Sequence, residues 1–328
     1  MTEYVDTEDG VRIAYDREGS GRPLILIGGA GQFRAVDQPT RTLTTELATR
    51  GFHVVHYDRP GRGDSGGEPP FTLAREVAAL RALVAMLGGR ASLYGSSSGG
   101  AIALAAAAEI PGIEHLVLWE VPLGEEEGSD GREFLSEITE RVRSGDREST
   151  LRRFMDGMPP EWFDGMRNGP DWPLFERMAP SVQADAEALA WTQSAPRRQL
   201  WAGVTAPTVV LVGTTAFPFF SDAADAIVAS LPTAERAELT GSDHGWQPVD
   251  LAEAVAAHLD GGAERRQSVR LSGSCRRRRT AGERSAASVS AANSTPPHIA
   301  TVRSPRAAAI GTMASWPRGT AAKDPSSS

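Results

Sequence analysis

Residues 95–99, with the sequence GSSSG, have the spacing of a G-x-S-x-G turn, in which the central serine is a nucleophile. An apolar run, residues 91–94, precedes this turn and an alanine-rich segment, residues 100–109, follows it, as the strand–turn–helix context of the motif requires. Only Ser97 holds the central position, so we predict that Ser97 is the nucleophile. The amide of Ser98 would then lie at a helix N-terminus, where a free N–H group stabilises an oxyanion.

Two other segments supply the groups that such a serine needs. The glycine-rich turn at residues 28–31 directly follows the apolar run 24–27, and we predict that the amide of Ala30 is the second oxyanion donor. His244 follows the last predicted strand, where a loop can bring its imidazole to the serine as a general base. The other histidines are poorer candidates, because they lie in or beside predicted strands, on the last helix or in the C-terminal segment: His53, His56, His115, His258 and His298.

Short apolar runs alternate with helix-like segments along the body of the chain. The runs that predict strands are residues 24–27, 52–57, 91–94, 115–119, 207–212 and 236–239. The helix-like segments are residues 42–50, 73–87, 98–109, 222–230 and 251–259. This alternation predicts an α/β fold in which helices cover both faces of a mostly parallel sheet. Two alternating runs around Asp9 and Gly10 predict an antiparallel hairpin at the edge of that sheet.

The alternation of strands and helices stops between Pro122 and Pro207. Residues 123–206 contain amphipathic helical stretches and four of the seven tryptophans. We predict that they form a helical cap, inserted before the penultimate strand of an α/β core made of residues 1–122 and 207–262. The tryptophans and methionines of the cap either build its own small core or line an apolar substrate pocket beneath a lid.

Charge is unevenly distributed along the 328 residues. The net charge of the whole chain is −8, but residues 263–328 carry +9 and residues 1–262 carry −17. The hydrophobic periodicity ends after residue 262, and small, polar and basic residues dominate, so we predict a disordered basic tail at residues 263–328. The four arginines at 276–279 suggest an anionic surface or nucleic acid as a second possibility, without aromatic residues for base stacking. The acidity of the body disfavours nucleic acid as a partner of the core.

Composition excludes several other classes of protein. A single cysteine excludes a disulfide framework and a cysteine-based zinc site, and the chain has no phosphate-binding loop or dinucleotide fingerprint. We therefore expect no metal and no cofactor. The polar N-terminus lacks the regions of a signal peptide, and no stretch approaches the ~18 apolar residues of a membrane-spanning helix. We expect a soluble cytoplasmic protein that acts on a small molecule and not at a membrane, and we predict no particular oligomeric state.

With these motifs, residues 3–260 resemble the α/β-hydrolase superfamily. Residues 57–65 (YDRPGRGDS) look like the turn Y-D-x-x-G-x-G-x-S that follows the fourth strand in this family, and we expect them to support the oxyanion turn. Gly28 is a departure, because many members have histidine before the glycine. The resemblance implies the α/β-hydrolase fold and a catalytic triad in the order serine, acid, histidine along the chain.

The resemblance gives two positions for the acid of the triad. Most members place it shortly after the strand that corresponds to residues 208–212, but here residues 213–216 read GTTA, without a carboxylate. Some members place it after the preceding strand, and residues 118–122 (LWEVP) look like their pattern, so we predict Glu120. Asp222 is the alternative acid, and the absence of an effective acid is a third possibility. A carboxylate at this point orients the imidazole and stabilises the imidazolium.

The predicted activity is that of a serine hydrolase, which cleaves an ester, lactone or thioester of a small apolar substrate through an acyl-enzyme. The family resemblance implies that dehalogenases and epoxide hydrolases have an aspartate nucleophile at this turn. This chain has serine there, so we set both of these chemistries aside. Carbon–carbon bond hydrolysis, a cyclase or lyase reaction of secondary metabolism, and perhydrolysis use the same triad and stay open. From another class, a non-hydrolysing small-molecule receptor is also open, although an intact triad favours an enzyme.

Overall fold

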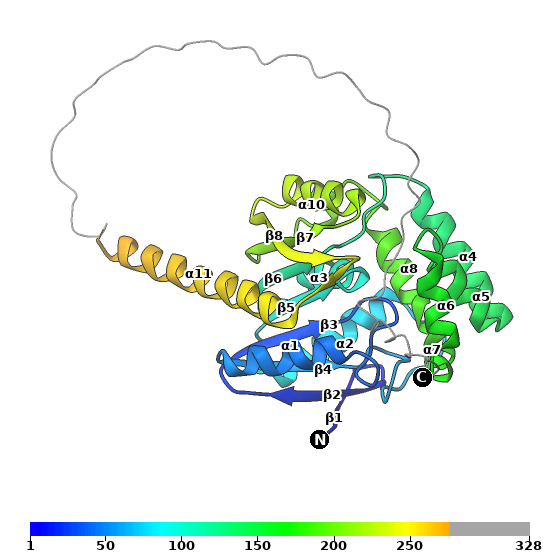
Figure 1. The fold of residues 1–328 in the computed structure, drawn as a ribbon. Helices are drawn as coiled ribbons and strands as arrows, with labels where there is room; N and C mark the ends of the chain where they lie inside the picture. The colour runs from blue at the N-terminus through cyan, green and yellow to red at the C-terminus, as the bar shows by residue number, and fades with distance from the viewer. Residues whose placement is uncertain (276–328) are drawn as a thin grey trace, which may run out of the picture.

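A nine-stranded sheet forms the centre of the computed structural model, which describes residues 1–275 and their side chains through residue 261 (Figure 1). The strands are β1 (Glu3–Asp6), β2 (Arg12–Glu18), β3 (Arg22–Ile27), β4 (Phe52–Tyr57), β5 (Ala91–Ser96), β6 (Ile113–Trp119), β7 (Thr208–Thr215), β8 (Ala234–Ser242) and β9 (Gly245–Trp246). Their order is β1-β2-β4-β3-β5-β6-β7-β8-β9. The six central strands, in the sheet order β4-β3-β5-β6-β7-β8, pair in parallel. Antiparallel pairs lie at both edges of the sheet: β1 with β2, β2 with β4, and β8 with β9. The mostly parallel sheet and the N-terminal hairpin are thus confirmed.

Helices cover both faces of the sheet, and β3 shows why its sequence is continuously apolar. Leu24 and Leu26 pack into a cluster with residues of α1 and α11, whereas Ile25 and Ile27 pack into a second cluster with residues of α2 and α3. Successive side chains of a strand point to opposite faces, so a strand buried on both faces must be apolar at every position. The covering helices are α1 (Gln38–Thr49), α2 (Leu73–Met86), α3 (Ser98–Glu109), α10 (Pro218–Ser230) and α11 (Pro248–Cys275).

Helices alone fill the chain between β6 and β7. They are α4 (Asp130–Ser144), α5 (Arg147–Phe154), α6 (Pro160–Asn168), α7 (Trp172–Met178), the 3₁₀ helix η1 (Ala179–Ser181), α8 (Val182–Trp191) and α9 (Arg197–Leu200). We call residues 130–200 the helical insertion. Figure 1 places it beside the edge of the sheet where the parallel strands end, and α8 packs against α2 and α3. Ring contacts such as Phe134–Phe154 and Phe163–Trp172 lie inside the insertion, and its buried apolar residues are continuous with the cluster on the α2 and α3 face of the sheet.

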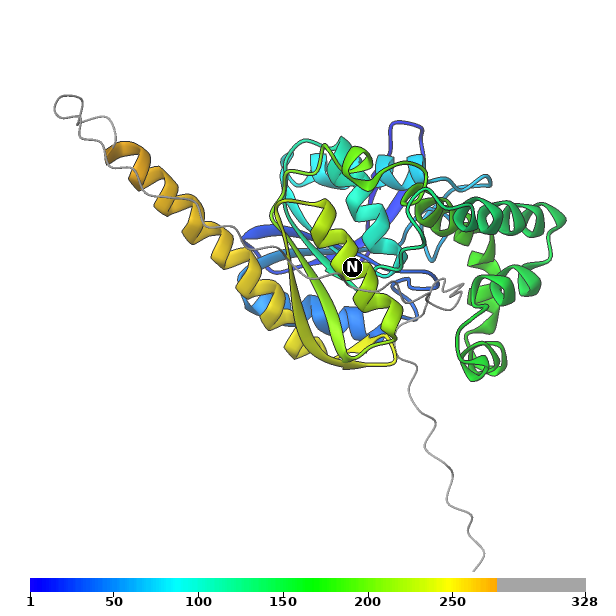
Figure 2. The same cartoon turned by 90° about the horizontal axis from the view of Figure 1, so that it is seen from above.

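Two features at the C-terminal end differ from the sequence prediction. The two-residue strand β9 follows β8, so the insertion precedes the third strand from the end; two residues are too short to show an alternating pattern. Helix α11 continues through Cys275, into the segment predicted as tail, and projects from the body on the side away from the insertion (Figure 2). Residues 264–267 (ERRQ) have high helix propensity, which favours this extension. The rest of the predicted tail, residues 276–328, lies outside the described residues.

Among the described residues, no helix is both long enough and apolar enough to cross a membrane.

The turn between β5 and α3 needs glycine where the backbones touch. A Cβ atom on Gly99 would lie 2.5 Å from the carbonyl oxygen of Ile27 and 2.7 Å from that of Gly28. A Cβ atom on Gly95 would lie 2.6 Å from the Cα atom of Gly100. These contacts are with backbone, which cannot rotate away as a flexible side chain can. The start of α3 is therefore pressed directly against the turn that follows β3.

We expect Gly99→Ala to lower the free energy of unfolding by about 1–3 kcal/mol, the usual cost of overpacking. The matched control is Gly165→Ala in α6, because a Cβ atom there meets nothing within 4 Å. This control should raise the free energy of unfolding by about 0.5–1 kcal/mol, since glycine is a poor helix former. Chemical denaturation of both variants measures the difference. Equal stability of the two variants would contradict the close backbone contact.

The buried histidine His56 on β4 should make the free energy of unfolding depend on pH. Burial and the nearby cations Arg34 and Arg41 lower the pKa of His56 from 6.5 to about 3, although Asp16 opposes this. As the pH falls through 6.5, the unfolded chain takes up a proton on this residue and the folded chain does not. The stabilising effect is therefore complete above pH 6.5 and is lost progressively as the pH falls toward 3. Between pH 7 and pH 5 the loss should be about 2 kcal/mol.

Denaturation of wild type and His56→Gln at both pH values tests this expectation. The variant should lose less stability than wild type between pH 7 and pH 5, whatever its stability at pH 7. His53→Gln, on the same strand but half-buried, is the control for removal of an imidazole from β4. A His56→Gln variant with the full wild-type dependence would show that another group titrates.

Candidate active site

Ser97, Glu120 and His244 meet at one edge of the sheet. Ser97 directly follows β5, Glu120 directly follows β6, and His244 lies in the turn between β8 and β9. The carboxyl ends of parallel strands point to the same edge of a sheet, which brings segments far apart in sequence together. All three residues are buried, with at most 1% of each exposed.

The backbone at all three positions is strained. Ser97 has φ 54° and ψ −127°, Glu120 has φ 42° and His244 has φ 63°. Only two other non-glycine residues of the described chain have positive φ, and one of them is Asp243, next to His244. Such conformations cost about 1–3 kcal/mol each and persist only where the surroundings enforce them. Their concentration at one edge of the sheet marks this edge as a functional site.

The carboxylate of Glu120 is held at both oxygens. Its Oε2 lies 2.5 Å from Nδ1 of His244, and its Oε1 accepts a hydrogen bond of 2.9 Å from the amide of Gly213. A Cβ atom on Gly213 would lie 2.9 Å from Oε1, so the glycine leaves room for a carboxylate that arrives from the neighbouring strand. The alternative acid Asp222 lies exposed on α10 and, among the described residues, makes no hydrogen bond or ion pair with His244.

Trp119 ties the serine to the histidine. Its carbonyl oxygen accepts a hydrogen bond of 2.8 Å from the amide of Ser97, and its indole Nε1 donates one of 3.1 Å to the carbonyl of His244. Sequence reasoning identified Trp119 only as the end of a strand. It also missed Phe220 of α10, whose ring stacks on the imidazole of His244 at 4.5 Å between centroids and 8° between planes. The aromatic sequence of residues 217–220 is the signal that could have identified this contact.

Ser97 Oγ and His244 Nε2 have no hydrogen-bond partner among the described residues. Both atoms are buried, and they are not hydrogen-bonded to each other. Because Nδ1 faces the carboxylate of Glu120, it carries the proton of the neutral imidazole, and Nε2 keeps its lone pair. A buried hydroxyl and a buried base thus both keep unused hydrogen-bonding capacity. Catalytic hydrogen bonds are often long in a protein without substrate and tighten on binding.

Two backbone amides beside Ser97 are also free. The amides of Ala30 and Ser98 have no acceptor among residues 1–275, whereas the amide of Gly29 donates to Oε1 of Gln32 at 2.6 Å. A Cβ atom on Gly29 would lie 3.0 Å from Cβ of Ser97, so the turn at residues 28–31 touches the serine. The structure therefore places all five sequence-predicted residues at one site: Ser97, His244, Glu120, Ala30 and Ser98. This arrangement can attack a carbonyl group and stabilise the oxyanion that forms.

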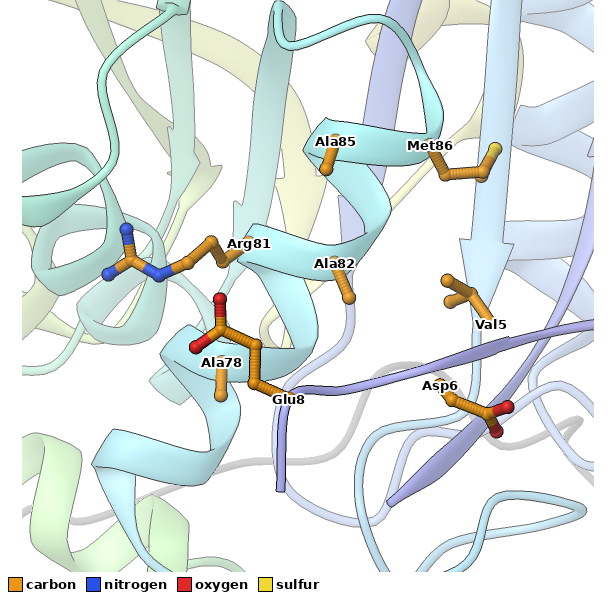
Figure 3. A pocket seen from close by; sticks show the side chains of 8 residues that line it. All are labelled: Val5, Asp6, Glu8, Ala78, Arg81, Ala82, Ala85 and Met86. Carbon is orange, nitrogen blue, oxygen red and sulfur yellow. The ribbon is translucent and has the colours of Figure 1, made fainter. Parts of the chain in front are cut away.

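The candidate site coincides neither with a cluster of metal-binding side chains among the described residues nor with the cavity in Figure 3. The described residues contain no group of three or more His, Cys, Asp or Glu side chains that could hold a metal ion. The cavity in Figure 3 has a volume of about 330 Å³ and lies between β1 and α2, among side chains such as Val5, Arg81 and Met86. None of its lining residues belongs to the cluster around Ser97.

Comparison with known proteins finds a hydrolase family model and solved hydrolase structures that are similar to this chain. Residues 24–258 match the model of a family described as the alpha/beta hydrolase family. An alpha/beta hydrolase from Sphaerobacter thermophilus is similar in structure, with 30% sequence identity, a TM-score of 0.68, and coverage of 78% of this chain and 100% of that one. A thermophilic esterase from Thermogutta terrifontis shares the fold at 22% identity and a TM-score of 0.61, with 81% and 98% coverage.

Curated relatives match over a shorter segment. A zearalenone hydrolase from Cladophialophora bantiana is 32% identical over 114 residues, which is 32% of this chain and 41% of that protein. A zearalenone hydrolase from Bionectria ochroleuca is 28% identical over 108 residues, 31% of this chain and 39% of that protein. The match thus spans about two fifths of the length of these relatives.

Proposed function

The chain belongs to the alpha/beta hydrolase family, and we propose that it is a serine hydrolase acting through an acyl-enzyme on an ester, lactone or thioester of a small apolar substrate. The observation that carries this proposal is the pairing of Glu120 with His244 Nδ1, which leaves the buried Nε2 free at the sheet edge that also holds Ser97. The hydrolase family is shared with the relatives; the serine mechanism and the substrate class are our proposal.

The proposed reaction has two halves. In the first, His244 Nε2 takes the proton of Ser97 Oγ while this oxygen attacks the carbonyl carbon of the substrate. The amides of Ala30 and Ser98 hold the resulting oxyanion, and each such donor is worth about 10²–10³-fold in rate. The tetrahedral intermediate then collapses, and the leaving group departs with the proton from His244. In the second half, water attacks the acyl-enzyme, gives its proton to His244 and releases the acid, and Ser97 recovers its proton.

Glu120 has no direct contact with substrate in this mechanism. Its carboxylate keeps the proton of the neutral imidazole on Nδ1, and it stabilises the imidazolium that forms in both halves. The bond from the amide of Gly213 and the stacked ring of Phe220 restrict rotation of the carboxylate and of the imidazole. Both groups are therefore oriented before substrate binds, which lowers the entropic cost of reaching the transition state.

An aromatic path from the helical insertion to His244 supports an apolar substrate. The ring centroids of Trp162 on α6 and Phe217 lie 6.2 Å apart, and those of Phe217 and Phe220 lie 6.4 Å apart. The ring of Phe220 in turn stacks on His244. Trp162 and Phe217 are only partly buried, so apolar surface is available close to the imidazole. We infer that residues 123–206 act as a cap that covers the substrate. Zearalenone, which names two relatives, is a substrate to test beside simple esters.

We expect Ser97→Ala to reduce turnover of p-nitrophenyl acetate to the uncatalysed background, because no other group replaces the nucleophile. Ser96→Ala is the matched control, since it removes a neighbouring buried hydroxyl that lies on β5. This control should keep most of the activity. Steady-state rates and labelling by a fluorophosphonate probe are the measurements. Undiminished turnover by a folded Ser97→Ala protein would rule out the proposed nucleophile, and unlabelled active wild type would indicate a different mechanism.

Neutralising Glu120 should lower kcat by about 10⁴-fold, because the amide of Glu120→Gln favours the wrong tautomer of the imidazole. KM should change little, since Glu120 does not touch the substrate. Asp222→Asn is the control for the alternative acid and should leave kcat within about twofold, because its exposed side chain is not in contact with His244. A loss confined to Asp222→Asn would instead assign the acid to α10.

A further inference from the structure

A cluster of buried charges joins the helical insertion to the core beside Ser97. Arg59 and Arg62 belong to the turn after β4, Glu76 belongs to α2, and Asp185 belongs to α8 of the insertion; each is at most 1% exposed. Arg59 Nη1 lies 2.6 Å from Asp185 Oδ1 and its Nη2 lies 2.9 Å from Glu76 Oε1, while Arg62 Nη2 pairs with Asp185 Oδ2. Apolar residues of similar volume often replace such clusters without loss of stability. Stability alone is thus a weak reason for these charges.

Arg62 reaches the oxyanion turn through a backbone carbonyl. Its Nη1 donates a hydrogen bond of 2.7 Å to the carbonyl oxygen of Gly29, and Arg59 Nη1 donates one of 3.2 Å to that of Gly28. The carbonyl of Gly29 and the N–H of Ala30 belong to one planar trans peptide unit, in which they point in opposite directions. Holding the carbonyl oxygen therefore fixes the direction of the Ala30 N–H. The positive guanidinium also polarises this peptide, which strengthens its N–H as a donor.

The same cluster holds the other oxyanion donor. Ser98 Oγ donates a hydrogen bond of 2.7 Å to Asp185 Oδ1, and both residues are fully buried. The carboxylate of Asp185 therefore binds Ser98, which carries one of the two amides. Through Arg62 it also holds the Gly29–Ala30 peptide, which carries the other. Burial disfavours ionisation of Asp185, but Arg59 and Arg62 and the Ser98 hydroxyl outweigh it, so its pKa lies below the ordinary value. The carboxylate is thus charged at neutral pH.

We propose that Asp185 and Arg62 are positioning residues, which hold the amides of Ala30 and Ser98 in the geometry of an oxyanion hole and make that geometry depend on the docking of α8. This inference rests on the proposed function, since it assigns a role to groups outside the triad. Asp185 does not touch the reacting atoms. Its effect should appear in the stabilisation of the transition state and not in the binding of substrate.

The first test is Asp185→Asn, which keeps the size of the side chain and removes its charge. We expect kcat for p-nitrophenyl acetate to fall by about 10–10²-fold, because both donors lose their alignment, while KM stays within about twofold. A trifluoromethyl ketone that adds to Ser97 Oγ places a negative oxygen in the oxyanion hole. Its affinity should fall by the same factor as kcat/KM. Arg62→Lys keeps the charge but loses the planar fork, and it should show the same pattern.

A matched control separates this role from the loss of any buried charged group. Arg197 in the insertion is buried, and its guanidinium donates to the carbonyls of Gly124 and Thr192, away from the oxyanion turns. Arg197→Lys should leave both kcat/KM and affinity for the ketone within about twofold of wild type, even where stability falls. Rates are expressed per site labelled by the fluorophosphonate probe, so that misfolded protein is not counted.

Ser98→Ala covers the case in which the charge variants do not fold. It removes only the hydroxyl that binds Asp185 and leaves the backbone amide in place. It should lower kcat/KM and affinity for the ketone together, and its effect should be smaller than additive with that of Asp185→Asn, because the two residues share one bond. Unchanged kcat and ketone affinity in the folded variants, or a change in KM alone, would overturn the inference. An inactive wild type, or an active Ser97→Ala variant, would instead refute the proposed function.

Discussion

The carboxyl end of β6 is the fixed point around which the site is arranged. The carbonyl of Trp119 accepts a hydrogen bond from the amide of Ser97, and its indole N–H donates one to the carbonyl of His244. The carboxylate of the next residue, Glu120, binds the imidazole of His244. Trp119 is fully buried, and its strand pairs in parallel with both β5 and β7. The rigidity of a sheet buried on both faces is therefore passed directly to the proposed nucleophile, base and acid.

This arrangement also explains how the strained backbone persists. A positive φ at Ser97, Glu120 and His244 costs free energy, but each residue is joined to another strand of the sheet by a backbone or side-chain hydrogen bond. The amide of Glu120, for example, donates to the carbonyl of Leu211 on β7. Relaxing one residue would leave buried polar groups unpaired, at about 1–3 kcal/mol each. The bonds that enforce the strain are thus the same bonds that bring the three side chains together.

Sequence could predict the parts of the site that depend on local pattern. Ser97, Ser98 and Ala30 follow directly from a strand, a glycine-rich turn and a helix, and this order along the chain is local information. Glu120 required the resemblance to a family, because one acid after a strand is not distinctive by itself. Asp185 was not predicted at all, since an acid within an amphipathic helix usually faces solvent; its partner Ser98 lies 87 positions away. Such contacts depend on how α8 docks, which no periodicity encodes.

The place of the acid has a consequence for the insertion. Glu120 ends β6, and the helical insertion is part of the connection that leads from this residue to β7. Gly213 on β7 lacks a side chain, and a Cβ atom there would lie 2.9 Å from Glu120 Oε1, so the carboxylate from β6 occupies space that a side chain at this position would need. The insertion is therefore attached to the acid through the chain and to both oxyanion turns through Asp185. A change in the packing of α8 would therefore act on both proposed oxyanion donors, so the proposed mechanism constrains the sequence of the insertion as well as its packing.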